Sequence, residues 1–157
     1  MGPIKKVNPY SGCIVNSYRF HTQRREKNRK TQNSGIVVKG EHGNNVIDYY
    51  GVLQDALEVE YLGTNNRVLV FQCDWFNLSD SNGMRFDKDC GLTSVNMSRK
   101  WYINEPYVLA SQVRQVFYST DIRYGGNWYI VRNVSPRRLY DVPQVKEATE
   151  MEEVYQE

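Results

Sequence analysis

The side chains that could act as nucleophiles, bases or metal ligands are few in this sequence and lie far apart. His21 and His42 stand in polar surroundings, and neither accompanies a serine or cysteine nucleophile in a recognisable motif. A nucleophile needs a base within hydrogen-bond reach, so a histidine-based triad is not expected. Cys13, Cys73 and Cys90 form no CxxC pair and have no nearby histidine, which argues against a zinc site and fits a reducing compartment.

Carboxylates are the remaining candidates for catalysis. Asp55, Asp74 and Asp87 would form the magnesium site of a nuclease if the fold brought them together, but scattered carboxylates on strands and loops are usually solvated. The sequence has no GxxxxGK[ST], GxGxxG or HExxH motif, which excludes phosphate-loop, dinucleotide and zincin sites of the usual kind. We therefore expect no enzymatic activity, no cofactor and no small-molecule substrate.

Aromatic residues offer binding chemistry, because several rings beside one carboxylate can hold a methylated ammonium group by cation–π attraction. The residues that would supply such a cage are Tyr49, Tyr50, Asp74, Trp75, Phe76, Trp101 and Tyr102. Core packing is the alternative for most of these rings. If Trp101 and Tyr102 are exposed instead, they would form an aromatic surface that docks a protein partner.

A basic segment from Arg19 to Lys30 is the candidate contact for phosphates. It holds six basic residues against the single acid Glu26, and no apolar residue follows Phe20. These features indicate an exposed, mobile loop that is either simply solvated or in contact with DNA or an acidic surface. The residues expected to contact nucleic acid are Arg19, Arg24, Arg25, Lys27, Arg29, Lys30, Arg137 and Arg138.

The net charge of +2 hides an uneven distribution along the chain. Residues 1–50 carry nine Lys and Arg against three Asp and Glu, whereas residues 51–157 carry eleven against fifteen. A basic front favours an anionic partner, while the near-neutral total argues against a protein that coats DNA. The sequence shows no signal peptide and no apolar run long enough to span a membrane, so we expect an intracellular protein with no membrane contact.

A long hairpin is the element on which most of these side chains would depend. The segment Tyr49–Tyr61 is ambiguous, because its apolar residues fit both a strand and one face of a helix. The residues that fit the period of two of a strand are Leu53, Leu57, Val59 and Tyr61. Gly63 and the asparagines after it are turn residues, so a hairpin is favoured. The second arm, Arg67–Phe76, alternates and places one set of side chains in the core: Leu69, Phe71, Cys73 and Trp75.

Further short strands are expected in the runs CIVNSYRFHT, GIVVKGE, GLTSVNM, RQVFYST and NWYIVRNV, the first two lying on either side of the basic segment. Pro106 suits the first turn of a helix, so a short helical turn should precede RQVFYST. Several short strands separated by glycine-containing turns predict a mainly β fold. The expected architecture is a small barrel or sandwich of about six to eight strands with one short helical turn.

Three parts are expected along the chain. Residues 1–45 form a basic lead-in with a β-hairpin, and residues 46–143 form a β-rich domain. Residues 144–157 form a disordered acidic tail, because KEATEMEEVYQE has five Glu and too few apolar residues to anchor it.

The middle of the chain closely resembles a plant family, the domain of unknown function 4216, which is found in proteins of En/Spm-type (CACTA) transposons. The blocks that carry the resemblance are YYGVLQDALEVEYLG, NRVLVFQCDWFN and GLTSVNMSRKWYINEPYVLASQVRQVFYSTD, over about residues 46–121. The preceding FHTQRREKNRKTQNSGIVVKGE is similar to the segment that commonly leads into this domain. The resemblance implies a transposon origin and offers no catalytic residue. A more distant analogy, to the small barrels of the bromo-adjacent-homology type, concerns the fold alone.

These observations give a leading hypothesis and two alternatives. The leading one is a nuclear, transposon-derived accessory module without enzymatic activity that binds DNA or chromatin through the basic segment, with help from Arg137 and Arg138. The first alternative is a protein-interaction domain that docks transposase subunits or host nuclear proteins through Trp101 and Tyr102. The second is a metal-dependent nuclease that uses the three aspartates.

Overall fold

The computed structural model describes residues 3–28, 32–42, 44–63, 66–101, 106–136 and 154–155. Its strands are β1 (Ile4–Tyr10), β2 (Gly12–Val15), β3 (Tyr18–His21), β4 (Gly35–His42), β5 (Asn45–Tyr61), β6 (Arg67–Phe76), β7 (Met84–Asp87), β8 (Leu92–Asn96), β9 (Lys100–Trp101), β10 (Tyr107–Leu109), β11 (Arg114–Thr120), β12 (Trp128–Asn133) and β13 (Val154–Tyr155). Its helical elements are the single turns α1 (Gln23–Glu26) and η1 (Ala110–Gln112). The mainly β fold is thereby confirmed.

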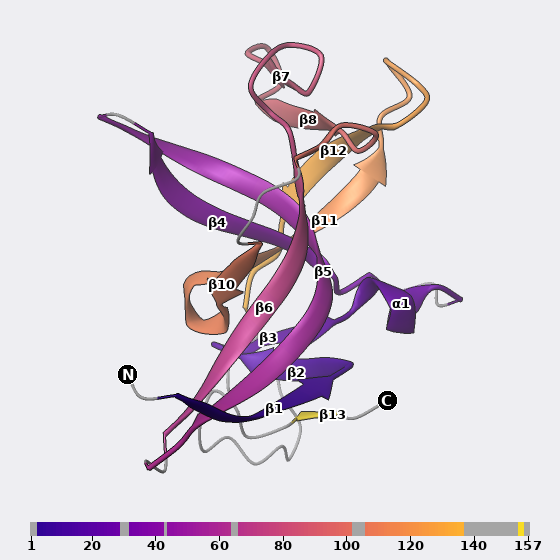
Figure 1. Ribbon diagram of the computed structural model, residues 1–157. Coiled ribbons are helices and arrows are strands. Elements are labelled where there is room, and N and C mark those ends of the chain that lie inside the picture. The colour runs from indigo at the N-terminus through magenta and orange to yellow at the C-terminus, as the bar shows by residue number, and fades with distance from the viewer. Residues whose placement is uncertain are drawn as a thin grey trace.

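The strands form one large sheet and one small sheet (Figure 1). The large sheet curls into half of a barrel, with the order β10-β6-β5-β4-β11-β12-β8-β7. Strand β1 pairs with the second half of β5, and β9 pairs with the end of β6. The small sheet has the order β13-β2-β3, so its hairpin lies within the first apolar run of the sequence and not around the basic segment.

The long hairpin predicted from Tyr49 to Phe76 is confirmed as the antiparallel pair β5–β6. Gly63 adopts a φ of +80° in the connection between the arms, a conformation that glycine tolerates best. The four residues assigned to the core from the alternation of β6 are all buried: Leu69, Phe71, Cys73 and Trp75.

A β-bulge in β5 changes which side chains face the core. Leu53 pairs with Cys73, but Asp55 pairs with Gln72, so Gln54 is an extra residue in the ladder. After the bulge, Ala56 pairs with the core residue Phe71 and is itself fully buried. The prediction that Leu57, Val59 and Tyr61 share the face of Leu53 is therefore wrong, because one inserted residue reverses the faces of everything after it.

Two hydrophobic clusters pack on opposite faces of the middle of the sheet. Consecutive residues of one strand divide between them: Ile36, Leu53 and Trp75 belong to the first cluster, and Val37, Val52 and Phe76 belong to the second. Side chains of neighbouring residues in a strand point to opposite faces, so strands buried on both faces have continuous apolar runs.

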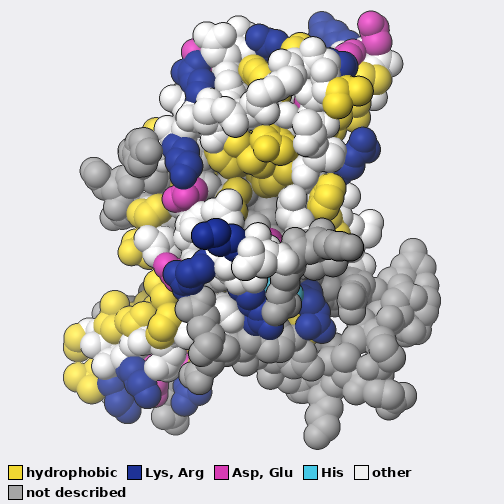
Figure 2. All heavy atoms as spheres, turned by 90° about the vertical axis from the view of Figure 1, so that its right-hand side faces the viewer, with side chains coloured by type: hydrophobic (Ala, Val, Ile, Leu, Met, Phe, Trp, Pro, Cys, Tyr) yellow, Lys and Arg dark blue, Asp and Glu magenta, His cyan; other side chains and the backbone are white. Residues whose placement is uncertain are grey.

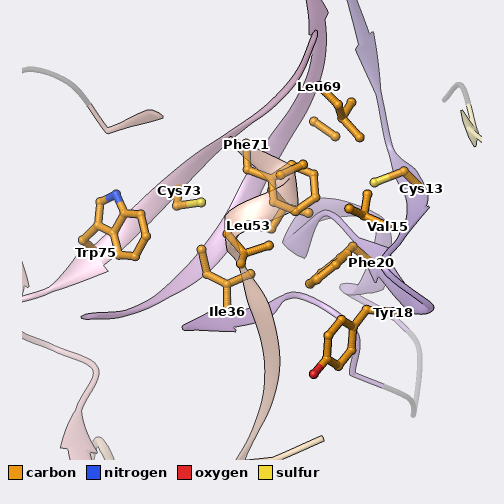
Figure 3. Packing of buried hydrophobic residues seen from close by; sticks show 13 residues of the cluster. Cys13, Val15, Tyr18, Phe20, Ile36, Leu53, Leu69, Phe71, Cys73 and Trp75 are labelled. Atoms are coloured by element: carbon orange, nitrogen blue, oxygen red, sulfur yellow. The ribbon is translucent and has the colours of Figure 1, made fainter. Parts of the chain in front are cut away.

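The first cluster lies between β5–β6 and the small sheet. Figure 3 shows Phe71 of β6 directed toward Phe20 of β3 and Val15 of β2. The rings of Phe71 and Phe20 meet edge to face, with 5.1 Å between their centroids. Such contacts attach the small sheet to the large one.

The helical turn expected before RQVFYST is confirmed as η1, and the strand after it as β11. Val108 and Leu109, which lie between Pro106 and η1, are not helical and belong to strand β10. In the acidic end, residues 144–153, 156 and 157 lie outside the described residues, whereas Val154–Tyr155 pairs with β2.

Replacing Phe71 with alanine should lower the free energy of unfolding by about 3–5 kcal/mol, because its fully buried ring would leave a cavity against Phe20. Chemical denaturation followed by fluorescence measures this change. Phe86→Ala is the matched control, since Phe86 is 60% exposed and its loss should change stability by less than about 0.5 kcal/mol. Equal effects of the two substitutions would contradict the assignment of the core.

Candidate functional site

Most of the described part of the basic segment is not a loop, so that prediction is wrong for Arg19 to Glu26, whereas Lys27 lies in an exposed turn. Arg19 lies in strand β3, and Gln23–Glu26 form α1, whose first turn is capped by the Thr22 hydroxyl accepting from the Arg25 backbone N–H. Glu26 is buried, and its carboxylate accepts from the Asn33 backbone N–H. Glu26, the one acidic residue of the basic segment, therefore anchors this segment to the chain at Asn33.

Two arginines of this segment are engaged in contacts within the chain. The Arg24 guanidinium lies 3.7 Å from the Asp55 carboxylate, and Arg25 Nη1 donates to Ser11 Oγ at 3.0 Å. Lys27 is exposed, and Arg24 remains largely exposed beside its partner. Arg29, Lys30, Arg137 and Arg138 lie outside the described residues.

Trp101 is partly exposed, as the partner-docking hypothesis requires, with 45% of its surface accessible. Its ring stacks on Tyr49 with 6.0 Å between centroids, and it lines a small hollow of about 150 Å³ with Trp75, Asp74 and Lys100. Tyr102 lies outside the described residues. The hollow is half the size of the smallest pockets that usually hold drug-sized ligands.

The aromatic residues considered for a cage do not converge on one point. Tyr50 and Phe76 belong to the second cluster, on the opposite face of the sheet from Trp75. Trp75 is buried and donates from Nε1 to the Pro106 carbonyl at 3.1 Å. In the hollow beside Trp101, Asp74 already has a cation, because Lys100 Nζ lies 3.3 Å from its carboxylate.

The three aspartates considered as metal ligands each face a different cation. Asp55 lies near Arg24, Asp74 near Lys100, and Asp87 near Arg123. Within the part of the chain that the structure describes, no group of three or more His, Cys, Asp or Glu side chains could hold a metal ion. In the same part, no helix is long and apolar enough to cross a membrane.

The cysteines have two different environments. Burial raises the pKa of the Cys13 thiol to about 12 and also raises that of Cys73, so both thiols stay protonated at neutral pH. Cys73 is a core residue, as the alternation of β6 predicts. Cys90 is exposed in the β7–β8 turn, where Arg123 Nη1 lies 3.8 Å from its sulfur.

A group of arginines and aromatic rings on the outer face of β7–β8–β12 was not expected from the sequence. The Arg85 guanidinium lies 4.5 Å from the ring centroid of Tyr124 and 4.5 Å from that of Trp128. The two rings are themselves in contact, with 5.3 Å between centroids. Arg85 Nε donates to the Ser81 carbonyl, and among the described residues no carboxylate pairs with Arg85.

This face continues onto β11. Register pairing places Phe117 opposite Arg132, and Arg85 opposite Ser94, which in turn pairs with Ile130. Phe117 is 38% exposed, and Arg132 is exposed, with its Nε donating to the Ser119 hydroxyl. We call the group Arg85, Phe117, Tyr124, Trp128 and Arg132 the arginine–aromatic face.

A buried carboxylate stabilises the β11–β12 turn, which contains Tyr124 and leads into Trp128 at the start of β12. Asp121 is fully buried, and its two oxygens accept from Arg123 Nε at 3.0 Å and Arg123 Nη2 at 2.9 Å. The hydroxyl of Ser94 also donates to it. Hydrogen bonds from the Arg123 guanidinium, together with that from Ser94, lower the pKa of the Asp121 carboxyl to about 2.

The Arg123 guanidinium also links the β11–β12 turn to the β7–β8 hairpin. Its Nη1 donates to the carboxylate of Asp87, the last residue of β7, at 2.7 Å. Gly125 and Gly126 have φ values of +68° and +58°, which allow the tight return of the chain to β12. The arginine–aromatic face is therefore built on a rigid support, although most of its residues come from separate segments.

Replacing Asp121 with asparagine should lower the free energy of unfolding at neutral pH by about 1.5–3 kcal/mol, because it removes charge-assisted hydrogen bonds to Arg123. The folded-state pKa lies below the ordinary value of 3.8, so the unfolded state binds more protons between about pH 4 and pH 2. The stabilisation by Asp121 is thus present above that window and is lost as the pH falls through it.

Urea unfolding of the wild type and Asp121→Asn between about pH 6 and pH 2 tests this expectation. The difference between the two proteins should shrink toward the acid end. Asp89→Asn serves as the control, because Asp89 is exposed in the neighbouring turn. A difference that stays constant with pH would contradict the role assigned to the Asp121 charge.

Comparison with known proteins gives one match. No curated protein and no solved structure matches the chain. Residues 57–131, from the second half of β5 into β12, match the model of a family described as Domain of unknown function (DUF4216), and this stretch holds Arg85, Phe117, Tyr124 and Trp128; this part of the chain is therefore similar to that family.

Proposed function

We propose that the chain is a non-enzymatic accessory module that binds single-stranded nucleic acid through the arginine–aromatic face. The observation that carries the proposal is the position of Arg85, held between Tyr124 and Trp128 without a carboxylate partner among the described residues. An arginine held in this way keeps its charge available to an anion, while its stem and plane are already ordered.

Exposed rings beside such an arginine suit unpaired bases. Tyr124 is 41% exposed and Phe117 is 38% exposed, and Arg132 lies directly opposite Phe117 in the ladder. Proteins that bind single strands combine aromatic side chains, on which bases stack, with cations that follow the phosphates. A duplex offers no free base faces to these rings, so single strands should be preferred.

The surrounding surface also favours an anionic ligand. On the side of the molecule shown in Figure 2, which carries α1 and the β11–β12 turn, Lys and Arg side chains lie among hydrophobic ones with fewer Asp and Glu. Two exposed cations, Arg24 of α1 and Lys27 directly after it, would extend the positive surface. The basic lead-in thus assists binding and does not form its centre.

The biological setting is part of the same proposal. The resemblance of residues 46–121 to transposon-encoded proteins supports a transposon-derived origin, and a nucleic-acid ligand would suit a nuclear location. Localisation of the tagged protein in plant cells tests this setting, since an exclusively extranuclear protein would contradict it.

Neutralising both arginines of the face, as Arg85→Gln with Arg132→Gln, should weaken binding to a labelled single-stranded oligonucleotide of about 20 nucleotides by ten-fold or more. The slope of log K against log salt should fall by about 1.4, since each lost phosphate contact contributes about 0.7. Phe117→Ala should cost about 1–3 kcal/mol through lost base stacking. Fluorescence anisotropy at several salt concentrations measures these effects.

Two matched controls locate the site. Arg24→Gln with Lys27→Gln removes the same charge from α1 and the turn after it, and Phe86→Ala removes an exposed ring from the opposite face of the sheet, where Phe86 pairs with Thr93. Both should leave most of the affinity intact. The proposal fails if the wild type shows no salt-dependent binding, or if the α1 variant alone abolishes it.

Docking of a transposase subunit or a nuclear host protein is a second candidate function, favoured by the exposed ring of Trp101 beside its hollow. If it holds, Trp101→Ala should release at least one protein from a pull-down of nuclear extract that persists after nuclease treatment. Phe86→Ala should retain it. Loss of every bound protein on nuclease treatment would instead indicate bridging by nucleic acid and reject this candidate.

A further inference from the structure

We propose that Ile122 packs against the last base pair of a duplex, so that the preferred ligand is a single strand that continues from a duplex end. The inference rests on the proposed function, because the single-stranded part of such a ligand would occupy the arginine–aromatic face. Ile122 lies in the β11–β12 turn and is 89% exposed, more than any other large hydrophobic residue in the part of the chain that the structure describes. Its side chain is therefore available to a ligand.

The turn that carries Ile122 is held firmly in place. The Gly125 backbone N–H donates to the Asp121 carbonyl at 3.0 Å, which closes the turn around Ile122. The Met97 backbone N–H donates to the Asn127 carbonyl at 2.9 Å, which ties the turn to the end of β8. The buried Asp121 carboxylate anchors the same turn from below, through the hydrogen bonds described above. Binding would thus order little of the turn, which lowers the entropic cost of using Ile122 as a contact.

Ile122 lies close to the rings that would hold the single strand. Tyr124 is only two residues away, so the Cα atoms of the two residues are at most about 7 Å apart. Successive bases of one strand are about 3.4 Å apart along the helix axis, so this separation corresponds to about two base steps. The Tyr124 ring in turn contacts that of Trp128, with 5.3 Å between centroids. A strand stacked on these rings would bring its next bases to Ile122.

The chemistry of the side chain distinguishes Ile122 from the residues of the arginine–aromatic face. Unpaired bases stack on aromatic rings, and isoleucine has no such ring. Aliphatic side chains are instead used against paired bases, where proteins insert isoleucine or leucine as apolar wedges. A duplex end exposes the flat face of its last base pair to water, and contact with Ile122 would remove apolar surface of both from water. An aliphatic side chain beside aromatic ones therefore suits paired bases beside unpaired ones.

The position of the turn gives a duplex room to approach. Figure 1 shows the β11–β12 turn projecting at the upper end of the molecule, whereas the small sheet lies at the lower end. A duplex end could meet the tip of this turn while its single strand runs along the outer face of β12 and β8. A blunt duplex has no strand to place on that face, and a single strand has no base pair to place on Ile122.

Fluorescence anisotropy with three DNA probes tests the inference: a single strand of about 20 nucleotides, a blunt duplex of about 12 base pairs, and that duplex with the single strand as a 5′ or 3′ overhang. The wild type should bind one of the overhang probes at least about five-fold more tightly than the single strand, and the blunt duplex most weakly. Ile122→Ser should remove the advantage of the overhang probe and change the affinity for the single strand by less than about two-fold.

Val46→Ser is the matched control. Val46 is also β-branched and aliphatic, is 68% exposed, and lies in the β4–β5 hairpin, which carries no residue of the arginine–aromatic face. This variant should keep the wild-type preference, and circular dichroism should show an unchanged fold for both variants because both side chains are exposed.

Two results would overturn the inference and leave the proposed function intact. One is a wild type that binds the single strand as tightly as both overhang probes, and the other is an Ile122→Ser variant that keeps the wild-type preference. A wild type that binds none of the probes would instead reject the proposed function, and this inference with it.

Discussion

Burial of both faces of strand β5 is the constraint on which the other elements depend. Val52 and Leu53 are consecutive and enter different clusters, so each face of β5 needs a cover of its own. The small sheet covers one face, and the curl of the large sheet encloses the other. Gly51 makes this close packing possible, because a Cβ there would lie 2.6 Å from the Asp74 carbonyl oxygen and 3.0 Å from the Trp75 ring.

The parts of the fold that follow from periodicity were predictable, and the part that follows from an inserted residue was not. The alternation in Arg67–Phe76 identifies its core side chains correctly, because β6 has a regular ladder over this stretch. The period of two in Tyr49–Tyr61 fails at Gln54, where one extra residue changes the faces. Both Leu57 and Ala56 are apolar, so the sequence contains no sign of which one faces the core.

The basic segment shows a similar limit for sites. Its composition predicts a solvated loop, yet Glu26 is buried and the arginines find partners on other elements, as in Arg24 with Asp55. Conversely, the sequence gives no sign that Arg85 contacts Tyr124 and Trp128, because Arg85 is about forty residues from both rings. Only the antiparallel pairing of β12 with β8, and of β8 with β7, brings them together.

Residues 57–131, which match the family model, depend structurally on strands that precede them in the chain. Residues 57–131 contain β6 to β11, but β4 lies before them and is the strand that joins β5 to β11. Strand β1 likewise covers the edge of the second half of β5. Without these two strands, β6 and β10 would lose their hydrogen-bonded link to β11 and β12, and β5 would expose an unpaired edge. Strands β1 and β4 therefore act as structural parts of the sheet that carries the matched sequence.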